Sequence, residues 1–178
     1  MAEINTNSTK SDAKRNFRVG LIGYGGIGKF HTANWRVLNL YYPDLPVNIQ
    51  LRGAASRSQA SADLSVEEGG YQYSTTDYRE LLADQKIDLV DICTPNDTHY
   101  EIFTAALEAG KHIYLEKPLA LNVDQAREMA QQARDYEKVI QIAFNYRFVP
   151  AVMKARQLIE EGFLGDVVNF RAQYFHTG

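Results

Sequence analysis

Six residues near the start of the chain have the types and spacing of a phosphate-binding loop. Residues 23–28 follow an apolar run, open a segment of helical pattern and read G-x-G-x-x-G. The first glycine permits a tight turn, the second lets a pyrophosphate approach the backbone, and the third allows close packing of helix on strand. The N–H groups at the helix start can then bind the anion. We predict a dinucleotide site rather than an ordinary glycine-rich turn, formed by Gly23, Tyr24, Gly25, Gly26, Ile27 and Gly28.

The residues after the second predicted strand bear on which dinucleotide binds. An NAD site normally offers Asp or Glu to the ribose 2′-OH about 20 residues beyond the glycine loop. Residues 54–58 read Ala-Ala-Ser-Arg-Ser, so the carboxylate is missing, which also counts against a methyltransferase. A hydroxyl followed by a guanidinium suits a 2′-phosphate, because arginine makes bidentate, charge-assisted contacts. We predict that Ser56 and Arg57 favour NADP, with NAD as the second choice and a solvated Arg57 as the alternative.

The elements that must position these residues alternate along the chain. From Phe17 onward, short apolar runs are followed by segments of helical period, which is typical of a parallel sheet covered by helices on both faces. The fold class is therefore α/β, a Rossmann-type doubly wound parallel sheet. Ligands bind such sheets at the carboxyl ends of the strands. The predicted strands are residues 17–22, 49–55, 71–73, 87–93, 112–115 and 139–144.

Capping signals mark the helices between these strands. Thr98 with Glu101 predicts a capping box, and Asn122 with Gln125 predicts a second one. A weaker helix is expected after Asp77, and another begins near Pro150.

The chain divides by pattern into three parts. Residues 1–16 are polar and predict a flexible tail, and residues 17–147 predict the dinucleotide-binding domain. Residues 166–175 alternate apolar and polar side chains, the period of a strand with one wet face. A lone strand of this kind has no sheet to join. We therefore interpret residues 148–178 as the truncated start of an α+β second domain, and the sequence as a fragment of a longer protein.

Composition excludes several classes of protein. The chain has 178 residues, of which 45% are hydrophobic and 23% charged, and its net charge of −3 argues against nucleic acid as a partner. No apolar stretch approaches the length of about 20 residues that spans a membrane, and no signal peptide is evident. The single cysteine, Cys93, lies in an apolar run and predicts a buried, reduced thiol. These features predict a soluble protein in the cytoplasm.

Further residues follow the fourth and fifth predicted strands, and together they carry a family resemblance. Glu116, Lys117 and Pro118 end the fifth strand, and Asn145 to Phe148 follow the sixth. With Gly28 and His31 in the first helix, this order resembles the Gfo/Idh/MocA oxidoreductases, also called the glucose-fructose oxidoreductase or inositol dehydrogenase family. The residues after the fourth strand that match are Thr94, Pro95, Asn96 and His99.

The resemblance implies a hydride transfer between a nicotinamide cofactor and a sugar-, polyol- or carbonyl-type substrate. It implies that Glu116 contacts the nicotinamide ribose or ring and that Arg147 approaches the carboxamide. It also implies a second domain whose open sheet covers the nicotinamide and often forms a homo-oligomer interface. The residues that it places along the nicotinamide ribose are Thr94, Pro95, Asn96 and His99.

Lys117 is the predicted catalytic residue. The resemblance places it at the reacting carbon, where an ammonium would stabilise a developing alkoxide, and the alternative is a solvated loop lysine. The family's acid/base histidine is expected beyond Gly178, because His176 has no aspartate four residues before it. His31 and His112 are interpreted as structural, and no metal site is predicted. The fragment alone is expected to bind nucleotide without turnover.

Two other functions remain open at this stage. A regulatory protein of the same fold could sense NADP without catalysis, since fold does not determine function. An adaptor role for an isolated Rossmann-like domain would show itself by failure to bind any dinucleotide. Retention of Lys117 favours the enzyme.

Overall fold

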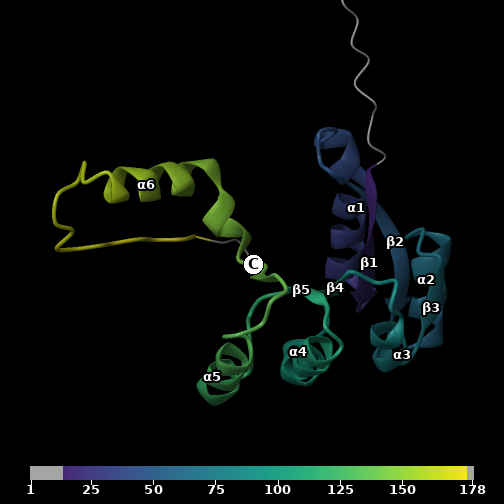
Figure 1. The fold of residues 1–178 in the computed structure, drawn as a ribbon. Coiled ribbons are helices and arrows are strands. Elements are labelled where there is room, and N and C mark those ends of the chain that lie inside the picture. The colour runs from purple at the N-terminus through teal and green to yellow at the C-terminus, as the bar shows by residue number, and fades with distance from the viewer. Residues whose placement is uncertain (1–13, 176–178) are drawn as a thin grey trace, which may run out of the picture. The chain divides into compact units, whose positions relative to one another are not determined.

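The computed structural model describes residues 14–175, and its central element is a six-stranded parallel sheet (Figure 1). The strand order is β3-β2-β1-β4-β5-β6, and every neighbouring pair is parallel. This order reverses direction after β1, as in a doubly wound dinucleotide-binding sheet, so the predicted fold class is confirmed. The strands are β1 (Arg15–Ile22), β2 (Val47–Ala55), β3 (Tyr73–Thr75), β4 (Leu89–Ile92), β5 (His112–Leu115) and β6 (Ile140–Ile142).

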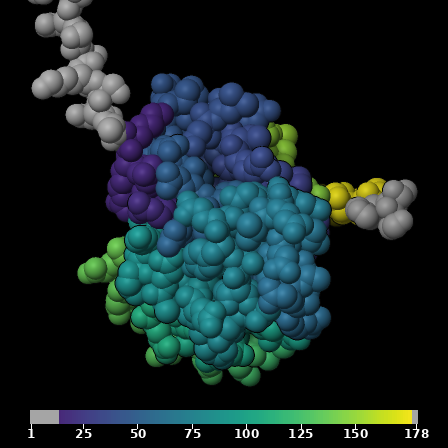
Figure 2. All heavy atoms as spheres, turned by 90° about the vertical axis from the view of Figure 1, so that its right-hand side faces the viewer, coloured from purple at the N-terminus to yellow at the C-terminus, as the bar shows by residue number. Residues whose placement is uncertain are grey.

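Helices connect these strands and cover both faces of the sheet. α4 packs against α3 and α5 on one face, while α1 packs on β2. α2 and α3 flank the edge strand β3, and their atoms form the surface at that edge of the sheet (Figure 2). The helices are α1 (Gly26–Tyr41), α2 (Gln59–Glu67), α3 (Tyr78–Ala83), α4 (His99–Glu108), α5 (Val123–Gln132) and α6 (Pro150–Glu160), with short 3-10 helices η1 (Asn96–Thr98) and η2 (Asn145–Phe148).

Two hydrophobic clusters lie on opposite faces of the sheet. Ile22 belongs to the larger cluster, which includes side chains of α3, α4 and α5, whereas its neighbour Leu21 belongs to the smaller one with Ala54 and Tyr71. Successive side chains of a strand point to opposite faces, so β1 contributes to both clusters. On the Leu21 face, one row of the sheet places Asp91 between Leu21 and Tyr114. A buried aspartate therefore stands in the middle of this face.

The chain divides into two compact units, and the boundary along the sequence lies between Ala143 and Phe144. The boundary lies four residues before the predicted one at 147/148. The second unit contains η2 and α6. Residues 166–175, predicted as a strand of a truncated second domain, are exposed and form no strand with any described residue, so that strand stays a prediction. A strand requires a hydrogen-bonding neighbour, and its alternating pattern alone does not supply one.

Most element boundaries fall close to their predictions, with informative differences. Of the predicted tail, residues 1–13 lie outside the described part of the chain, while Arg15 and Asn16 extend β1. The capping box at Thr98 is wrong: Thr98 is the N-cap of α4, but its side chain makes no capping hydrogen bond, and its hydroxyl lies 2.8 Å from the Pro95 carbonyl oxygen. Asn122 caps α5 as predicted, accepting from the Gln125 N–H at 2.9 Å. His112 accepts from the Val139 N–H at 3.0 Å, a structural contact between β5 and the start of β6.

No helix among residues 14–175 is long and apolar enough to cross a membrane.

Candidate dinucleotide site

The glycine loop begins directly after β1 with a backbone conformation that only glycine adopts readily. Gly23 has a φ of +101°, and a Cβ there would lie 2.7 Å from the Cys93 carbonyl oxygen. Its N–H donates to the Ala55 carbonyl oxygen at 2.8 Å, so the loop is tied to the end of β2. The turn therefore passes between the carboxyl ends of β2 and β4, where a larger residue would not fit.

The remaining glycines form an open helix start. A Cβ at Gly28 would overlap the carbonyl oxygen of Gly23, so the third glycine is required for close packing. By contrast, a Cβ at Gly25 or Gly26 would meet no atom of the described residues within 4 Å. Gly25 is the N-cap of α1 and cannot supply a capping side chain. The first N–H groups of the helix therefore face open space and can bind an anion.

A cleft of about 630 Å³ opens beside this helix start. It lies over the carboxyl ends of β1, β2 and β4, the edge at which a doubly wound sheet binds its ligand. Of the predicted binding residues it is lined by Gly23, Tyr24, Gly25, Gly26, Ile27, Ser56, Arg57, Thr94 and Pro95. Gly28 lies beneath it, as its packing role requires.

The two predicted residues after β2, Ser56 and Arg57, have different surroundings. Ser56 is buried, and its Oγ accepts from the Tyr24 N–H at 3.1 Å, so this hydroxyl orders the glycine loop. Arg57 is exposed and lines the cleft. Ser58 caps α2 by accepting from the Ser61 N–H at 3.3 Å. An exposed guanidinium and the start of α2 therefore lie at this end of the cleft.

The segment after β4 contains the four residues predicted along the nicotinamide ribose. Thr94 and Pro95 line the cleft, whereas His99 is buried beneath the loop. The His99 ring lies between two carbonyl oxygens, with Nδ1 2.8 Å from that of Pro118 and Nε2 3.0 Å from that of Thr94. His99 thus joins the loops after β4 and β5 and does not reach into the cleft. Asn96 Oδ1 is buried and has no hydrogen-bond partner among the described residues.

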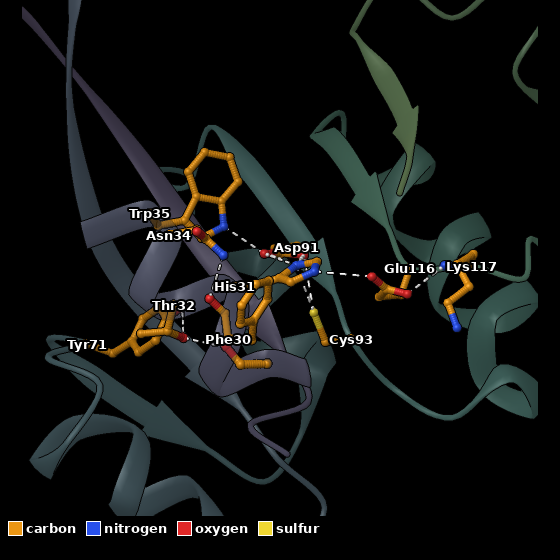
Figure 3. Close-up of polar contacts among 11 residues, drawn as sticks. Phe30, His31, Thr32, Asn34, Trp35, Tyr71, Asp91, Cys93, Glu116 and Lys117 are labelled. Carbon is orange, nitrogen blue, oxygen red and sulfur yellow. Dashed lines mark hydrogen bonds and ion pairs between the residues drawn. The ribbon is translucent and has the colours of Figure 1, made fainter. Parts of the chain in front are cut away.

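At the end of β5, each carboxylate oxygen of Glu116 has a polar neighbour (Figure 3). Oε2 accepts from the Lys117 N–H at 3.0 Å, and Oε1 lies 3.2 Å from His31 Nε2. His31 Nδ1 lies 3.0 Å from both carboxylate oxygens of Asp91. The Lys117 side chain is exposed at the same strand end. Sequence reasoning interpreted His31 as a packing histidine, but its ring connects two carboxylates.

Asp91 is fully buried and satisfied by several donors. Trp35 Nε1 donates to it at 2.7 Å, His31 Nδ1 donates at 3.0 Å, and the Cys93 thiol donates at 3.4 Å. Burial and the nearby Asp91 charge raise the pKa of Cys93, so the half-buried thiol stays protonated. His31, Asp91 and Cys93 place their polar atoms within 4.8 Å of one another. These hydrogen bonds and the protonated thiol argue against metal binding there.

The His31 charge state follows from its neighbours. Burial alone would lower the pKa of His31, but the hydrogen bond to Asp91 and the charges of Asp91 and Glu116 outweigh it, and the pKa is raised. His112 behaves in the opposite way, because burial and the nearby Lys138 lower its pKa. His31 on α1 and His112 on β5 therefore differ in which protonation form the fold favours.

Comparison with known proteins identifies the family. Residues 17–144 match the oxidoreductase family described as having an NAD-binding Rossmann fold. The chain belongs to the Gfo/Idh/MocA family. Levoglucosan dehydrogenase of Pseudarthrobacter phenanthrenivorans is 40% identical over 166 residues, which are 90% of this chain and 41% of that protein. D-glucoside 3-dehydrogenase of Escherichia coli is 35% identical over 151 residues, covering 84% of this chain and 41% of that enzyme.

Solved structures of the Gfo/Idh/MocA family superimpose on the chain. Levoglucosan dehydrogenase in complex with NADH and levoglucosan has a TM-score of 0.80 at 39% identity, covering 85% of this chain and 41% of that one. An NAD-binding oxidoreductase from Klebsiella pneumoniae has a TM-score of 0.78 at 42% identity, covering 83% and 39%. The chain thus spans about two fifths of the length of these relatives.

One predicted residue of the Gfo/Idh/MocA site lies outside the sheet unit. Arg147 is on η2, in the second unit, where its N–H donates to the Phe144 carbonyl oxygen at 3.0 Å. Its role toward the nicotinamide stays a prediction. His176 lies outside the described residues.

Sequence reasoning missed cleft residues on the helices that follow β2, β3 and β4. Tyr78 hydrogen bonds to Glu101, and burial together with this carboxylate raises the pKa of Tyr78 to about 12. Arg79 also donates to Glu101, at 2.6 Å, so this carboxylate is already engaged. A serine at position 58 is a typical N-cap, so the start of α2 could have been predicted from the sequence. No sequence signal indicates that α3 and α4 both contribute side chains to the cleft. The missed lining residues include Ser58, Ser61, Thr76, Tyr78, Asp97, Thr98 and Glu101.

Proposed function

We propose that this chain is the nucleotide-binding part of an NAD(P)-dependent dehydrogenase acting on a sugar- or polyol-type hydroxyl, or on the corresponding carbonyl. The observation that carries the proposal is the open start of α1. Gly25 and Gly26 leave space there, and no side chain of residues 14–175 caps the first N–H groups of the helix. The named relatives, which include levoglucosan, glucoside and inositol dehydrogenases, support the substrate class.

The residues present fit a nicotinamide dinucleotide. The N–H groups of the α1 start would bind the pyrophosphate. Asn96 Oδ1, which is buried and has no hydrogen-bond partner in the described part of the chain, is an acceptor in the loop after β4. When bound, the cofactor supplies the carbon that accepts or returns a hydride. His99 holds the β4 and β5 loops together, and Glu116 is fixed at the strand end. Lys117 would stabilise negative charge on the substrate oxygen as its proton leaves.

Arg57 carries the finer part of the proposal, a preference for NADP. Its guanidinium lines the cleft at the end of β2, and residues 54–58 offer no carboxylate to a ribose 2′-OH. The relative solved with NADH supports the alternative, NAD. Arginine would bind a 2′-phosphate through charge-assisted hydrogen bonds, whereas NAD presents only a hydroxyl there.

The experiment is a titration of the purified chain with NADPH and with NADH, following ligand fluorescence. We expect NADPH to bind more tightly, and Arg57→Ala to weaken NADPH about tenfold or more while changing NADH little. Arg127→Ala, an exposed arginine on α5, is the matched control for loss of one positive charge. Tighter NADH binding would refute the NADP preference and keep the dehydrogenase. Failure of a folded chain to bind either nucleotide would refute the proposed function.

We also propose that the whole protein works in the cytoplasm and self-associates through its second domain, without nucleic-acid or membrane partners. The second unit exposes apolar side chains that a sheet or partner subunit would cover, including Val168 and Phe170, which are 94% and 84% exposed. Sedimentation of the whole protein, compared with a chain ending at Ala143, tests the self-association.

A further inference from the structure

The connection between α1 and the ends of β4 and β5 is made by one histidine. His31 comes from the second turn of α1, and its ring stacks on Tyr114 of β5 with ring centres 5.3 Å apart. Its two nitrogens reach Asp91 on one side and Glu116 on the other (Figure 3). The imidazole side chain is 9% exposed, so water competes little for either contact.

The hydrogen-bond needs of Asp91 and Glu116 indicate which nitrogens of the His31 ring carry a hydrogen. Asp91 is fully buried, and a buried carboxylate needs donors, so His31 Nδ1 carries a hydrogen directed at it. Glu116 Oε2 already accepts from the Lys117 N–H, which leaves Oε1 opposite His31 Nε2 at 3.2 Å. A neutral ring would direct a lone pair at this carboxylate oxygen, and the two acceptors would repel each other. A hydrogen on Nε2 turns the same contact into a charge-assisted hydrogen bond.

We propose that His31 is a positioning residue: its imidazolium, oriented by Asp91, donates from Nε2 to Glu116 and fixes that carboxylate at the carboxyl end of β5. The proposal rests on the proposed function, which places the nicotinamide ribose at this strand end. Glu116 would then be held at both oxygens, by His31 and by the Lys117 backbone, before the cofactor binds. A carboxylate fixed in advance loses less conformational freedom on binding.

The charged and titratable groups around His31 favour the protonated ring. Asp91 and Glu116 are the two acidic neighbours, and their effect exceeds that of burial, so the pKa of His31 is raised. The neighbouring thiol and phenols stay neutral, because burial raises their pKa values. The titratable groups that face this cluster from β4, β5, their following loops and the loop before β3 are Asp91, Cys93, Tyr114, Glu116 and Tyr71.

The first test measures the protonation of the His31 imidazole in the absence of nucleotide. Nitrogen-15 chemical shifts of the imidazoles in the labelled chain report protonation at each nitrogen. We expect His31 to carry hydrogens on both nitrogens at neutral pH and to titrate above an ordinary histidine. Glu116→Gln keeps the size of the side chain and removes its charge, so it should move the His31 midpoint to lower pH. A neutral His31 at neutral pH, or a midpoint unchanged in Glu116→Gln, would overturn the proposal.

The second test separates positioning from simple packing by using two amides. In His31→Asn the amide nitrogen can reach only the Nδ1 position, toward Asp91. In His31→Gln it can reach the Nε2 position and still donate to Glu116. We expect His31→Asn to weaken NADH binding about threefold to tenfold, and His31→Gln to restore it. Asn34→Ala, an exposed position on the next turn of α1, is the control and should bind like the unsubstituted chain.

The pH profile of NADH binding completes the second test. NADH is used because the 2′-phosphate of NADPH itself titrates near pH 6. Affinity of the unsubstituted chain should fall as pH rises through the His31 midpoint, because Nε2 then loses the hydrogen that holds Glu116. The His31→Gln profile should be flat over the same range, since an amide does not titrate. Equal affinities in His31→Asn and His31→Gln, or an unsubstituted chain whose profile is as flat as that of His31→Gln, would overturn the positioning role.

The two tests also separate this proposal from the proposed function. If no nucleotide binds the folded chain, the proposed function fails, and the imidazole shifts alone decide whether His31 holds Glu116. If NADH binds and the shifts show a neutral His31, the proposed function stands and the positioning role fails.

Discussion

The two ends of the candidate site are built in different ways. At the β1–β2 end, backbone groups do the work: a glycine with positive φ, a helix start and the space left by Gly25 and Gly26. At the β4–β5 end, side chains from distant parts of the sequence hold one another, and His31 joins Asp91 to Glu116. The first end therefore depends on residues being small, and the second on buried polar groups being paired.

This difference predicts how each end fails. A backbone cradle is damaged by added volume, whereas a polar network is damaged by removal of one partner, because the others are left unsatisfied in a medium of low dielectric. Substitutions at the two ends should therefore differ in size, in pH dependence and in whether they affect stability or binding.

The largest effect on stability is expected for Asp91→Asn. The amide removes the charge that His31 Nδ1 and Trp35 Nε1 donate to, and it directs its own N–H groups at other donors. Breaking a buried charged network by changing one partner costs about 3 kcal/mol or more. Urea unfolding of the chain at neutral pH measures the loss. Asp88→Asn, at the solvent-accessible start of the same strand region, is the control and should cost less. Equal losses of unfolding free energy in the two variants would show that the buried Asp91 network stabilises the fold no more than the contacts of Asp88 do.

At the other end, Gly28→Ala and Gly25→Ala should separate stability from binding. A Cβ at Gly28 overlaps the Gly23 carbonyl oxygen, so the alanine should lower the free energy of unfolding by about 2 to 3 kcal/mol. A Cβ at Gly25 meets no described atom within 4 Å, so stability should hardly change. It would, however, stand where the pyrophosphate approaches, and NADH titration should show weaker binding. Unchanged binding in Gly25→Ala would place the phosphates elsewhere.

The same contrast explains which parts of the site could be predicted from the sequence. The glycine loop is local, because six consecutive residues encode the tight turn, the space for a pyrophosphate and the close packing of α1. In the structure, Gly23 forms the turn, Gly25 leaves open space and Gly28 packs against the backbone, as predicted. The His31 network is not local, because Asp91 is 60 residues away and Glu116 is 85 away. In the sequence, Asp91 only interrupts an apolar strand. The contacts of Asp91 depend on the strand register, which places it beside Leu21 on the face that α1 covers.

The same reasoning covers His99 and residues 166–175. The family resemblance places His99 along the nicotinamide ribose, whereas in the structure the turn through η1 directs its ring to the carbonyl oxygens of Thr94 and Pro118. Residues 166–175 have the alternation of a strand and no strand to pair with among the described residues. Pattern predicts which face of an element is apolar, while partners decide whether the element forms.

A smaller effect, and one that depends on pH, is expected for His31. The folded-state pKa of His31 is raised, so its stabilisation is fully present below the pKa of the unfolded chain and is lost as pH rises through the folded-state value. The difference in unfolding free energy between the unsubstituted chain and His31→Gln should therefore shrink with rising pH, by about 1 to 2 kcal/mol. His112, whose pKa is lowered, is present in both proteins and cancels in the difference. A difference that grows with pH would contradict the charged ring.

The smallest effect is expected for Ser56→Ala, which tests whether a side chain matters at the backbone-built end. The Ser56 hydroxyl is the acceptor for the Tyr24 N–H, and the alanine leaves that buried donor without it. A loss of about 1 kcal/mol is expected, measured by urea unfolding and independent of pH because no titrating group is involved. Ser58→Ala, at the exposed cap of α2, is the comparison. Nucleotide preference should survive in Ser56→Ala, since its hydroxyl is engaged by the loop and Arg57 lines the cleft. If NADPH binding alone weakened, Ser56 would belong to the phosphate site and not to the support of the glycine loop.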